Sequence, residues 1–105
     1  GRRVRVLMAE VDGKPVGYAI YFFTYSSFLA RPTLYLEDIF VLPEQRRLGL
    51  GGAFFKALLA EARREGCGRM EWVVLDWNTP AHRFYRKLGA RLLDDWNTYR
   101  IVLKS

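Results

Sequence analysis

Two adjacent carboxylates, Glu37 and Asp38, interrupt the otherwise apolar stretch LYLEDIFV at residues 34–41. A buried carboxylate is costly without a partner, so these acids indicate either structural ion pairs with nearby arginines or a site for a cationic ligand. Successive strand residues alternate between faces, and we therefore expect the two side chains on opposite sides of the strand. A Glu with a pKa near ~4.3 is too weak to deprotonate an ammonium directly, so a base here requires a water relay or a raised pKa.

A glycine-rich corner, PEQRRLGLGG at residues 43–52, follows this strand and precedes an amphipathic helical pattern. Unpaired backbone N–H groups at the start of a helix bind anions, and glycines let a ligand approach the backbone closely. The N–H donors expected to bind a diphosphate are those of Leu48, Gly49, Leu50, Gly51 and Gly52. Arg46 and Arg47 can add charge-assisted hydrogen bonds to phosphate oxygens. The alternative is an ordinary helix N-terminus beside surface arginines.

Two other glycine-rich phosphate loops do not fit the sequence. A Walker loop needs a lysine followed by Ser or Thr after the last glycine, where this chain has Ala53 and Phe54. A dinucleotide fingerprint that starts at Gly49 and Gly51 needs a further Gly or Ala at the position of Phe54. The pattern that remains is R-x-x-G-x-G, which runs from Arg46 to Gly51.

A third motif, WNTPAHRFY at residues 77–85, lies further along the chain. The order Y-L-E-D, R-x-x-G-x-G and W-N-x-P-x-x-x-F-Y resembles the GNAT acetyltransferase superfamily, and within it the diamine (spermidine/spermine) and thialysine N-acetyltransferase branch. The likeness covers about residues 16–90. It implies a GNAT-like fold and an enzyme that uses acetyl-CoA to acetylate the primary amine of a small cationic acceptor by direct attack.

The resemblance also implies roles for individual residues. Glu37 corresponds to a base that acts through water, and Glu37 and Asp38 together would hold the cationic amine. Tyr85 corresponds to the acid that contacts the cofactor and protonates the coenzyme A thiolate, although its helix position beside Phe84 also suits a core residue. The remaining cofactor contacts would come from the side chain of Asn78 and the backbone N–H groups of Ile39, Phe40 and Val41.

The elements that must position these residues follow from the apolar pattern. Residues 4–11 and 16–25 read as a hairpin about Asp12-Gly13-Lys14, followed by the strand at 34–41. An amphipathic helix follows, whose apolar face is formed by Gly51, Phe54, Phe55, Leu58, Leu59 and Ala62, and Gly66 should cap its end.

The second half of the chain should complete the strand-helix-strand crossover of residues 34–77 and add a second helix and two final strands. We expect a strand at 70–77, parallel to the strand at 34–41, and then a helix capped by Asn78 or Thr79 and ended by Gly89. The tail, residues 90–104, reads as two strands about a turn near Asp95. The predicted class is α/β with a mixed sheet, in the order β-β-β-α-β-α-β-β around a central parallel β-α-β unit.

The bulk composition limits the class of protein. The chain has 105 residues, half of them hydrophobic, which predicts one folded domain over residues 1–105. A single cysteine, Cys67, fits a reducing, cytoplasmic setting, and one Cys with one His makes a metal site improbable. The sequence has no apolar run long enough to cross a membrane, so we expect no membrane partner. The net charge of +6 favours phosphate-rich ligands, but the aromatics follow core periodicity, so we expect no nucleic-acid partner.

The sequence departs from the family at its start. The resembled fold begins with a strand and two helices before the hairpin, so the domain reads as truncated at its N-terminus. In the family those elements form one wall of the site for the acceptor amine, so activity and acceptor are open for this sequence. The alternatives are a non-catalytic acyl-CoA-binding module and a protein amino-group acetyltransferase. A strand beginning at Val4 would be an exposed sheet edge, and we therefore expect a homodimer.

Overall fold

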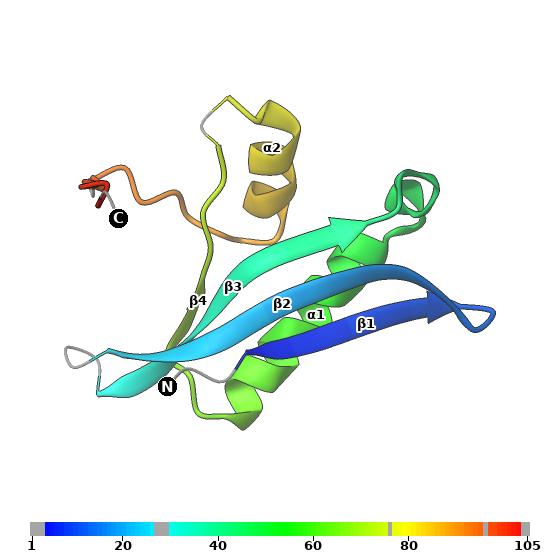
Figure 1. Ribbon diagram of the computed structural model, residues 1–105, viewed down its shortest axis with the longest axis horizontal. Coiled ribbons are helices and arrows are strands. Elements are labelled where there is room, and N and C mark those ends of the chain that lie inside the picture. Colours follow the sequence, from blue (N-terminus) through cyan, green and yellow to red (C-terminus); the bar gives the residue numbers. More distant parts are fainter. Residues whose placement is uncertain (1–3, 27–29, 76, 96, 104–105) are drawn as a thin grey trace. The chain divides into compact units, whose positions relative to one another are not determined.

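The computed structural model describes residues 4–26, 30–75, 77–95 and 97–103, and divides into two compact units at residues 1–73 and 74–105 (Figure 1). The elements are β1 (Arg5–Val11), β2 (Lys14–Ser26), β3 (Arg31–Val41), the 3₁₀ helix η1 (Pro43–Leu48), α1 (Leu50–Arg64), β4 (Arg69–Glu71) and α2 (Thr79–Lys87). The predicted order β-β-β-α-β-α is confirmed. β3 begins earlier than its apolar run because its first residues also pair with β2.

The first unit is a mixed sheet with the strand order β1-β2-β3-β4. β1 and β2 are antiparallel, β2 and β3 are antiparallel, and β3 and β4 are parallel. The turn between β1 and β2 has two left-handed residues, Asp12 with φ of 52° and Gly13 with φ of 75°. Two such residues favour a tight hairpin whose twist matches that of its strands. The hairpin prediction is confirmed.

Helix α1 covers one face of the sheet formed by β1, β2 and β3 (Figure 1). Its buried residues are Phe54, Phe55, Leu58 and Ala62, which are members of the predicted apolar face. The contact with β2 is close, since a Cβ on Gly17 would lie 3.1 Å from the Phe54 ring and 2.7 Å from the backbone oxygen of Phe40. Gly17 therefore allows the helix to approach the sheet.

Helix α1 ends as its sequence predicts. Gly66 adopts φ of 74°, and its N–H donates to the carbonyl of Arg63 at 3.1 Å. The N–H of Cys67 donates to the carbonyl of Ala62 at 2.9 Å. A left-handed glycine with these two bonds satisfies carbonyls that the last helical turn leaves unpaired.

Strand β4 is shorter than expected. A strand over 70–77 was predicted, but pairing with β3 covers only Arg69–Glu71, opposite Thr33, Leu34 and Tyr35. The parallel arrangement is confirmed, whereas the predicted length is wrong. A β-bulge in β3 lies just beyond the last pair, and a bulge bends its strand and increases the local twist. The pairing of the two strands ends at Tyr35 and Glu71, next to this bulge.

The tail does not form the two predicted strands. Residues 90–95 and 97–103 are neither helix nor strand, and their exposed apolar side chains are Leu92, Leu93, Tyr99, Ile101, Val102 and Leu103. The prediction was based on the apolar pattern alone. A strand also needs an edge to pair with, and an isolated two-stranded hairpin is marginally stable in water.

Helix α2 in the second unit has the predicted signals at both ends. The Oδ1 of Asn78 accepts a hydrogen bond from the N–H of Ala81 at 3.3 Å, so Asn78 is the N-cap. Gly89 adopts φ of 89°, and the N–H of Ala90 donates to the carbonyl of Tyr85 at 3.0 Å. Both the cap and the glycine terminator are confirmed.

A polar cluster joins α1 to the two N-terminal strands. Glu61 of α1 accepts hydrogen bonds from the hydroxyl of Tyr21 at 3.2 Å and from Arg5 at 3.1 Å, and it pairs with Arg64 at 2.9 Å. Its side chain is only 18% exposed, whereas that of Glu65, which contacts Arg5 at 3.4 Å, is 41% exposed. Glu61 therefore has the environment in which a charged hydrogen-bond network contributes to stability.

We predict that Glu61→Ala destabilises the fold by about 1–2 kcal/mol, because the substitution leaves the Tyr21 hydroxyl without its acceptor and leaves Arg5 with only its longer contact to Glu65. Glu65→Ala is the matched control on the same helix and should cost less than about 0.5 kcal/mol. Urea unfolding followed by circular dichroism measures both variants. Equal destabilisation by the two substitutions would contradict the assignment of Glu61 as the centre of the cluster.

Candidate active site

A β-bulge interrupts β3 at Glu37. Asp38 pairs with Ile20 of β2. Leu36 pairs with the next residue along β2, Tyr21, so Glu37 has no residue opposite it. Such a bulge breaks the alternation of side chains between the two faces. The prediction that strict alternation separates the two carboxylates is therefore wrong, and the side chains of Glu37 and Asp38 are both exposed.

Asp38 accepts a hydrogen bond across the β2–β3 pair. The hydroxyl of Tyr18 donates to Oδ2 of Asp38 at 3.1 Å. The Tyr18 ring stacks on Phe40, with ring centroids 5.7 Å apart and planes inclined by 29°. The hydrogen bond to Asp38 is the main cause, ahead of burial, that raises the pKa of Tyr18 above its ordinary value of 10.0. Glu37, in contrast, makes no hydrogen bond or ion pair with any side chain that the structure describes.

The second half of β3, residues 36–41, has an open edge. β4 pairs with β3 only as far as Tyr35, and no other described strand lies along residues 36–41 on that side. Alternate residues of an extended strand direct their N–H groups toward each edge, so this segment presents backbone donors that β4 does not use. The segment includes Ile39, Phe40 and Val41. Their expected contact with an acetyl carbonyl stays a prediction.

In the glycine-rich corner, one residue in the left-handed conformation connects η1 to α1. η1 ends at Leu48, Gly49 follows with φ of 76°, and α1 begins at Leu50. The N–H of Ala53 donates to the carbonyl of Gly49 at 3.1 Å and makes the first hydrogen bond of the helix. Three N–H groups precede it and have no acceptor within α1, namely those of Leu50, Gly51 and Gly52.

The positive end of α1 has no internal counter-charge. No side chain caps the N-terminus of the helix, and its first turn, as described, contains no acidic residue. An N-terminus with neither feature leaves its N–H groups and its dipole available to an external anion. Three of the five predicted donors, the N–H groups of Leu50, Gly51 and Gly52, therefore lie where a diphosphate could contact them, whereas Leu48 is the last residue of η1 and Gly49 follows it.

Gly52 provides an independent test of whether a ligand fits at this helix end. Its φ is not positive, and an added Cβ would meet no atom within 4 Å, so neither backbone conformation nor internal packing requires glycine. A glycine within a helix costs about 1 kcal/mol relative to alanine. The chain keeps open the space that a Cβ would fill beside the unpaired N–H groups, which fits the close approach of a diphosphate.

Arg46 connects the corner to the end of the strand. Its Nε donates to the carbonyl of Val41 at 3.0 Å, and the residue is exposed. The remaining guanidinium N–H groups of Arg46 are therefore held near the corner, where they could reach an anion. The predicted contact of the Arg47 side chain lies outside the described side chains.

The other two predicted site residues belong to the second unit. The Oδ1 of Asn78 is occupied as the cap of α2, which leaves its amide nitrogen as a donor. Tyr85 lies on α2 with its ring centroid 5.7 Å from that of Phe84, and burial raises the pKa of its phenol above 10.0. The phenol therefore keeps its proton at neutral pH. The Nε2 of His82, on the same helix, is buried without a hydrogen-bond partner among the described residues.

Sequence reasoning missed Tyr18. The residue appears in the return strand of the hairpin as one aromatic among several, and nothing in its spacing separates it from core residues. A register for the β2–β3 pair would have placed Tyr18 near Asp38, but that register depends on the bulge at Glu37. Bulges of this kind have no local sequence signature apart from the interrupted apolar pattern.

Comparison with known proteins assigns the family. The sequence profile of the Acetyltransferase (GNAT) family matches residues 2–90. The chain therefore belongs to the GNAT acetyltransferase family, as its motifs predict. Within the described residues, no helix is long and apolar enough to cross a membrane, and no group of three or more His, Cys, Asp or Glu is arranged for a metal ion.

Two curated relatives and one solved structure resemble the chain. The thialysine N-epsilon-acetyltransferase of Sus scrofa is 42% identical over 90% of this chain and 61% of its own. The L-ornithine N5-acetyltransferase NATA1 of Arabidopsis thaliana is 40% identical over 82% of this chain and 38% of its own. The chain thus spans between about two fifths and three fifths of these relatives. The aminoglycoside N-acetyltransferase AAC(6')-Iy, solved with CoA, superimposes with a TM-score of 0.81 at 25% identity, covering 95% of this chain and 77% of its own.

We predict that Gly52→Ala changes stability and ligand affinity in opposite directions. Alanine should raise the free energy of unfolding by up to about 1 kcal/mol because it favours the helix, while its methyl group weakens coenzyme A binding several-fold. Gly49→Ala is the contrasting variant, since a left-handed residue other than glycine costs about 1–2 kcal/mol. Urea unfolding and isothermal titration calorimetry measure the two effects. A stabilised Gly52→Ala protein with unchanged affinity for coenzyme A would contradict the assignment of this helix end.

Proposed function

We propose that the protein is an acetyl-CoA-dependent N-acetyltransferase that acetylates a primary amine of a small cationic acceptor such as a polyamine, a diamine or a lysine-like amino acid. The observation that carries the proposal is the open space at Gly52 beside the unpaired N–H groups that begin α1. This helix end follows directly from β3, whose edge is open over residues 36–41. A diphosphate at the helix and a thioester along the strand edge would suit these two features.

The acidic residues support a cationic acceptor. Glu37 and Asp38 lie together at the bulge and are exposed, so neither is neutralised inside the core. The relatives named above are a thialysine and an L-ornithine acetyltransferase, both named for amino acids with a side-chain amine. We infer that the two carboxylates attract such a side-chain amine to the edge of β3.

The reaction needs a route for the proton of the amine. An alkyl ammonium has a pKa near 10.4, so only about one molecule in 2,500 is neutral at pH 7, which is equivalent to roughly 4.6 kcal/mol. Glu37 is the proposed base, and it would act through a water because its carboxylate is a weak base. The absence of a hydrogen bond or ion pair between Glu37 and any described side chain leaves its oxygens able to accept from such a water.

The leaving thiolate needs an acid, and Tyr85 is the proposed donor. Burial raises the pKa of its phenol, which keeps the proton in place until the thiolate forms. Asn78 would contact the cofactor through its free amide nitrogen, and backbone N–H groups from Ile39 to Val41 would bind the acetyl carbonyl. Acetyl-CoA, when bound, supplies the activated acetyl group.

Two alternatives would share the same cofactor site. A non-catalytic acyl-CoA-binding module would bind acetyl-CoA with no turnover on any amine. A protein amino-group acetyltransferase would turn over a peptide in preference to free amines. The exposed position of the acids allows either acceptor, so activity against the two substrate classes separates these alternatives.

The direct test is a thiol-release assay with acetyl-CoA and a panel of polyamines, thialysine, lysine and peptides. We expect turnover with a small amine, and Tyr85→Phe should lower kcat by about 10²-fold or more while coenzyme A affinity stays within about twofold. No turnover with any member of the panel, together with intact acetyl-CoA binding, would favour the binding module. Unaltered kcat in Tyr85→Phe would exclude Tyr85 as the acid.

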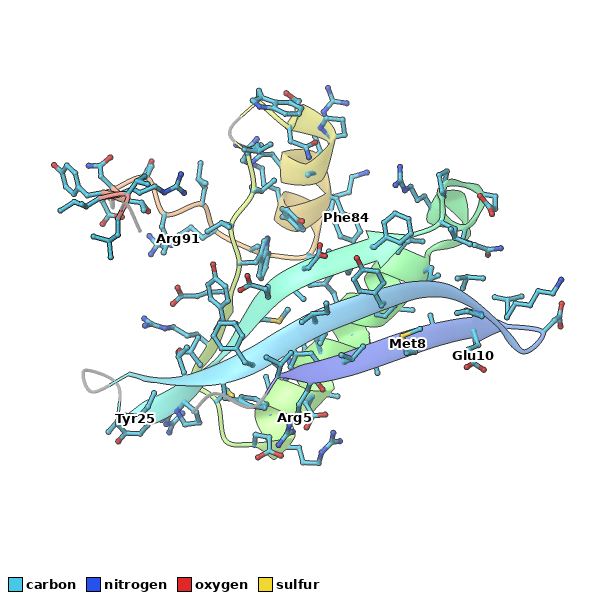
Figure 2. All side chains as sticks on the ribbon, in the orientation of Figure 1. Arg5, Met8, Glu10, Tyr25, Phe84 and Arg91 are labelled. Carbon is cyan, nitrogen blue, oxygen red and sulfur yellow. The ribbon has the colours of Figure 1, made fainter. Side chains whose placement is uncertain are left out.

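We also propose that the protein is a homodimer in the cytoplasm. Among the described strands β1 pairs only with β2, so its outer edge is unpaired, and its side chains Val6 and Met8 are 57% and 52% exposed (Met8 is labelled in Figure 2). An exposed apolar edge favours association with a second chain. Size-exclusion chromatography with light scattering should give about twice the chain mass of 12.3 kDa. A mass equal to that of one chain would contradict the dimer.

A further inference from the structure

We propose that Tyr18 is a positioning residue for the acceptor, and that its hydroxyl holds the Asp38 carboxylate beside the Tyr18–Phe40 ring pair to bind the second, non-reacting ammonium of a diamine. The inference deepens the proposed function and rests on it. It assigns different tasks to the two adjacent acids, with Glu37 serving the reacting amine and Asp38 the distant cation.

The geometry at Asp38 differs from that at Glu37. Oδ2 of Asp38 accepts the hydrogen bond from Tyr18 at 3.1 Å, which restricts the orientation of the carboxylate and leaves Oδ1 available to a cation. Glu37 has no comparable bond to a described side chain. A carboxylate of fixed orientation suits the recognition of a charge, whereas an unrestrained one suits contact with a water that exchanges protons.

The aromatic pair makes the surroundings of Asp38 favourable for an alkyl ammonium. Tyr18 and Phe40 are directly paired across β2 and β3, and their rings stack at 5.7 Å. Phe40 is 39% exposed despite being a large apolar residue, so part of its surface is accessible. Methylene groups can pack on such rings, and an ammonium within about 6 Å of a ring face gains a cation–π interaction.

Tyr18 acts in this arrangement as a hydrogen-bond donor and not as an acid. Its raised pKa keeps the phenol neutral at physiological pH, so the hydroxyl continues to donate to Asp38. Removing the hydroxyl while keeping the ring should therefore affect how the acceptor binds and leave the chemical step unchanged. This distinction separates Tyr18 from Tyr85.

The experiment compares 1,4-diaminobutane with butylamine, which has the same chain length and lacks the second ammonium. Tyr18→Phe should raise KM for the diamine about fivefold or more, since hydrogen bonds to charged groups contribute measurably even when partly exposed. We expect kcat, the KM for acetyl-CoA and the KM for butylamine to change by less than about twofold. Tyr25→Phe is the matched control, because Tyr25 lies on the same strand and is 70% exposed.

A double-mutant cycle tests whether Tyr18 acts through Asp38. Asp38→Asn should also remove the difference in KM between the diamine and butylamine. The double variant Tyr18→Phe/Asp38→Asn should have the same KM for the diamine as Asp38→Asn alone. Additive effects of the two substitutions, or an equal loss with butylamine, would overturn the proposal.

Calorimetric titration of 1,4-diaminobutane into each variant gives a readout that does not need turnover. Weaker diamine binding in Tyr18→Phe than in wild type supports the positioning role, even if the thiol-release assay shows no activity and contradicts the proposed function. Equal diamine affinity in the two proteins, or no diamine binding by the wild type, overturns the positioning role even if other amines are acetylated.

Discussion

The β-bulge at Glu37 sets the register in which β3 presents the residues of the candidate site. One extra residue in β3 shifts its register against β2, so that Leu36 pairs with Tyr21 and Asp38 pairs with Ile20. The same irregularity lies two residues beyond the last pair with β4. A single local feature therefore accounts for two properties: both acids are exposed, and the end of β3 has an edge with unused backbone donors.

The open edge of β3 and the N-terminus of α1 can contact one ligand together because they are consecutive in the chain. β3 ends at Val41, the corner turns through η1 and Gly49, and α1 begins with unpaired N–H groups. Arg46 donates to the carbonyl of Val41 and thereby holds the corner against the strand. The helix packs on the sheet through its buried face, which includes Phe54 and Phe55 close to the donors, and through Glu61 further along.

Much of this arrangement could be predicted from local sequence, because glycines and apolar periodicity act over a few residues. Gly13, Gly49, Gly66 and Gly89 all adopt the left-handed conformation that turns and helix ends require. The lengths of paired strands could not be predicted in the same way. The segment 70–77 has a suitable apolar pattern, but its pairing with β3 stops at Glu71, close to the bulge in β3. The hydrogen bond from Tyr18 to Asp38 depends on that same register, which only the folded sheet defines.

We propose that backbone N–H groups at the start of α1 bind the diphosphate of coenzyme A while the edge of β3 binds its thiol-bearing arm. Amide chemical shifts recorded during parallel NMR titrations with coenzyme A and with pantetheine, which lacks the diphosphate, test this claim most directly. The N–H signals of Leu50, Gly51 and Gly52 should move with coenzyme A alone, and signals from Ile39 to Val41 should move with both ligands. Coenzyme A binding that leaves the signals of Leu50 to Gly52 unchanged would contradict the account.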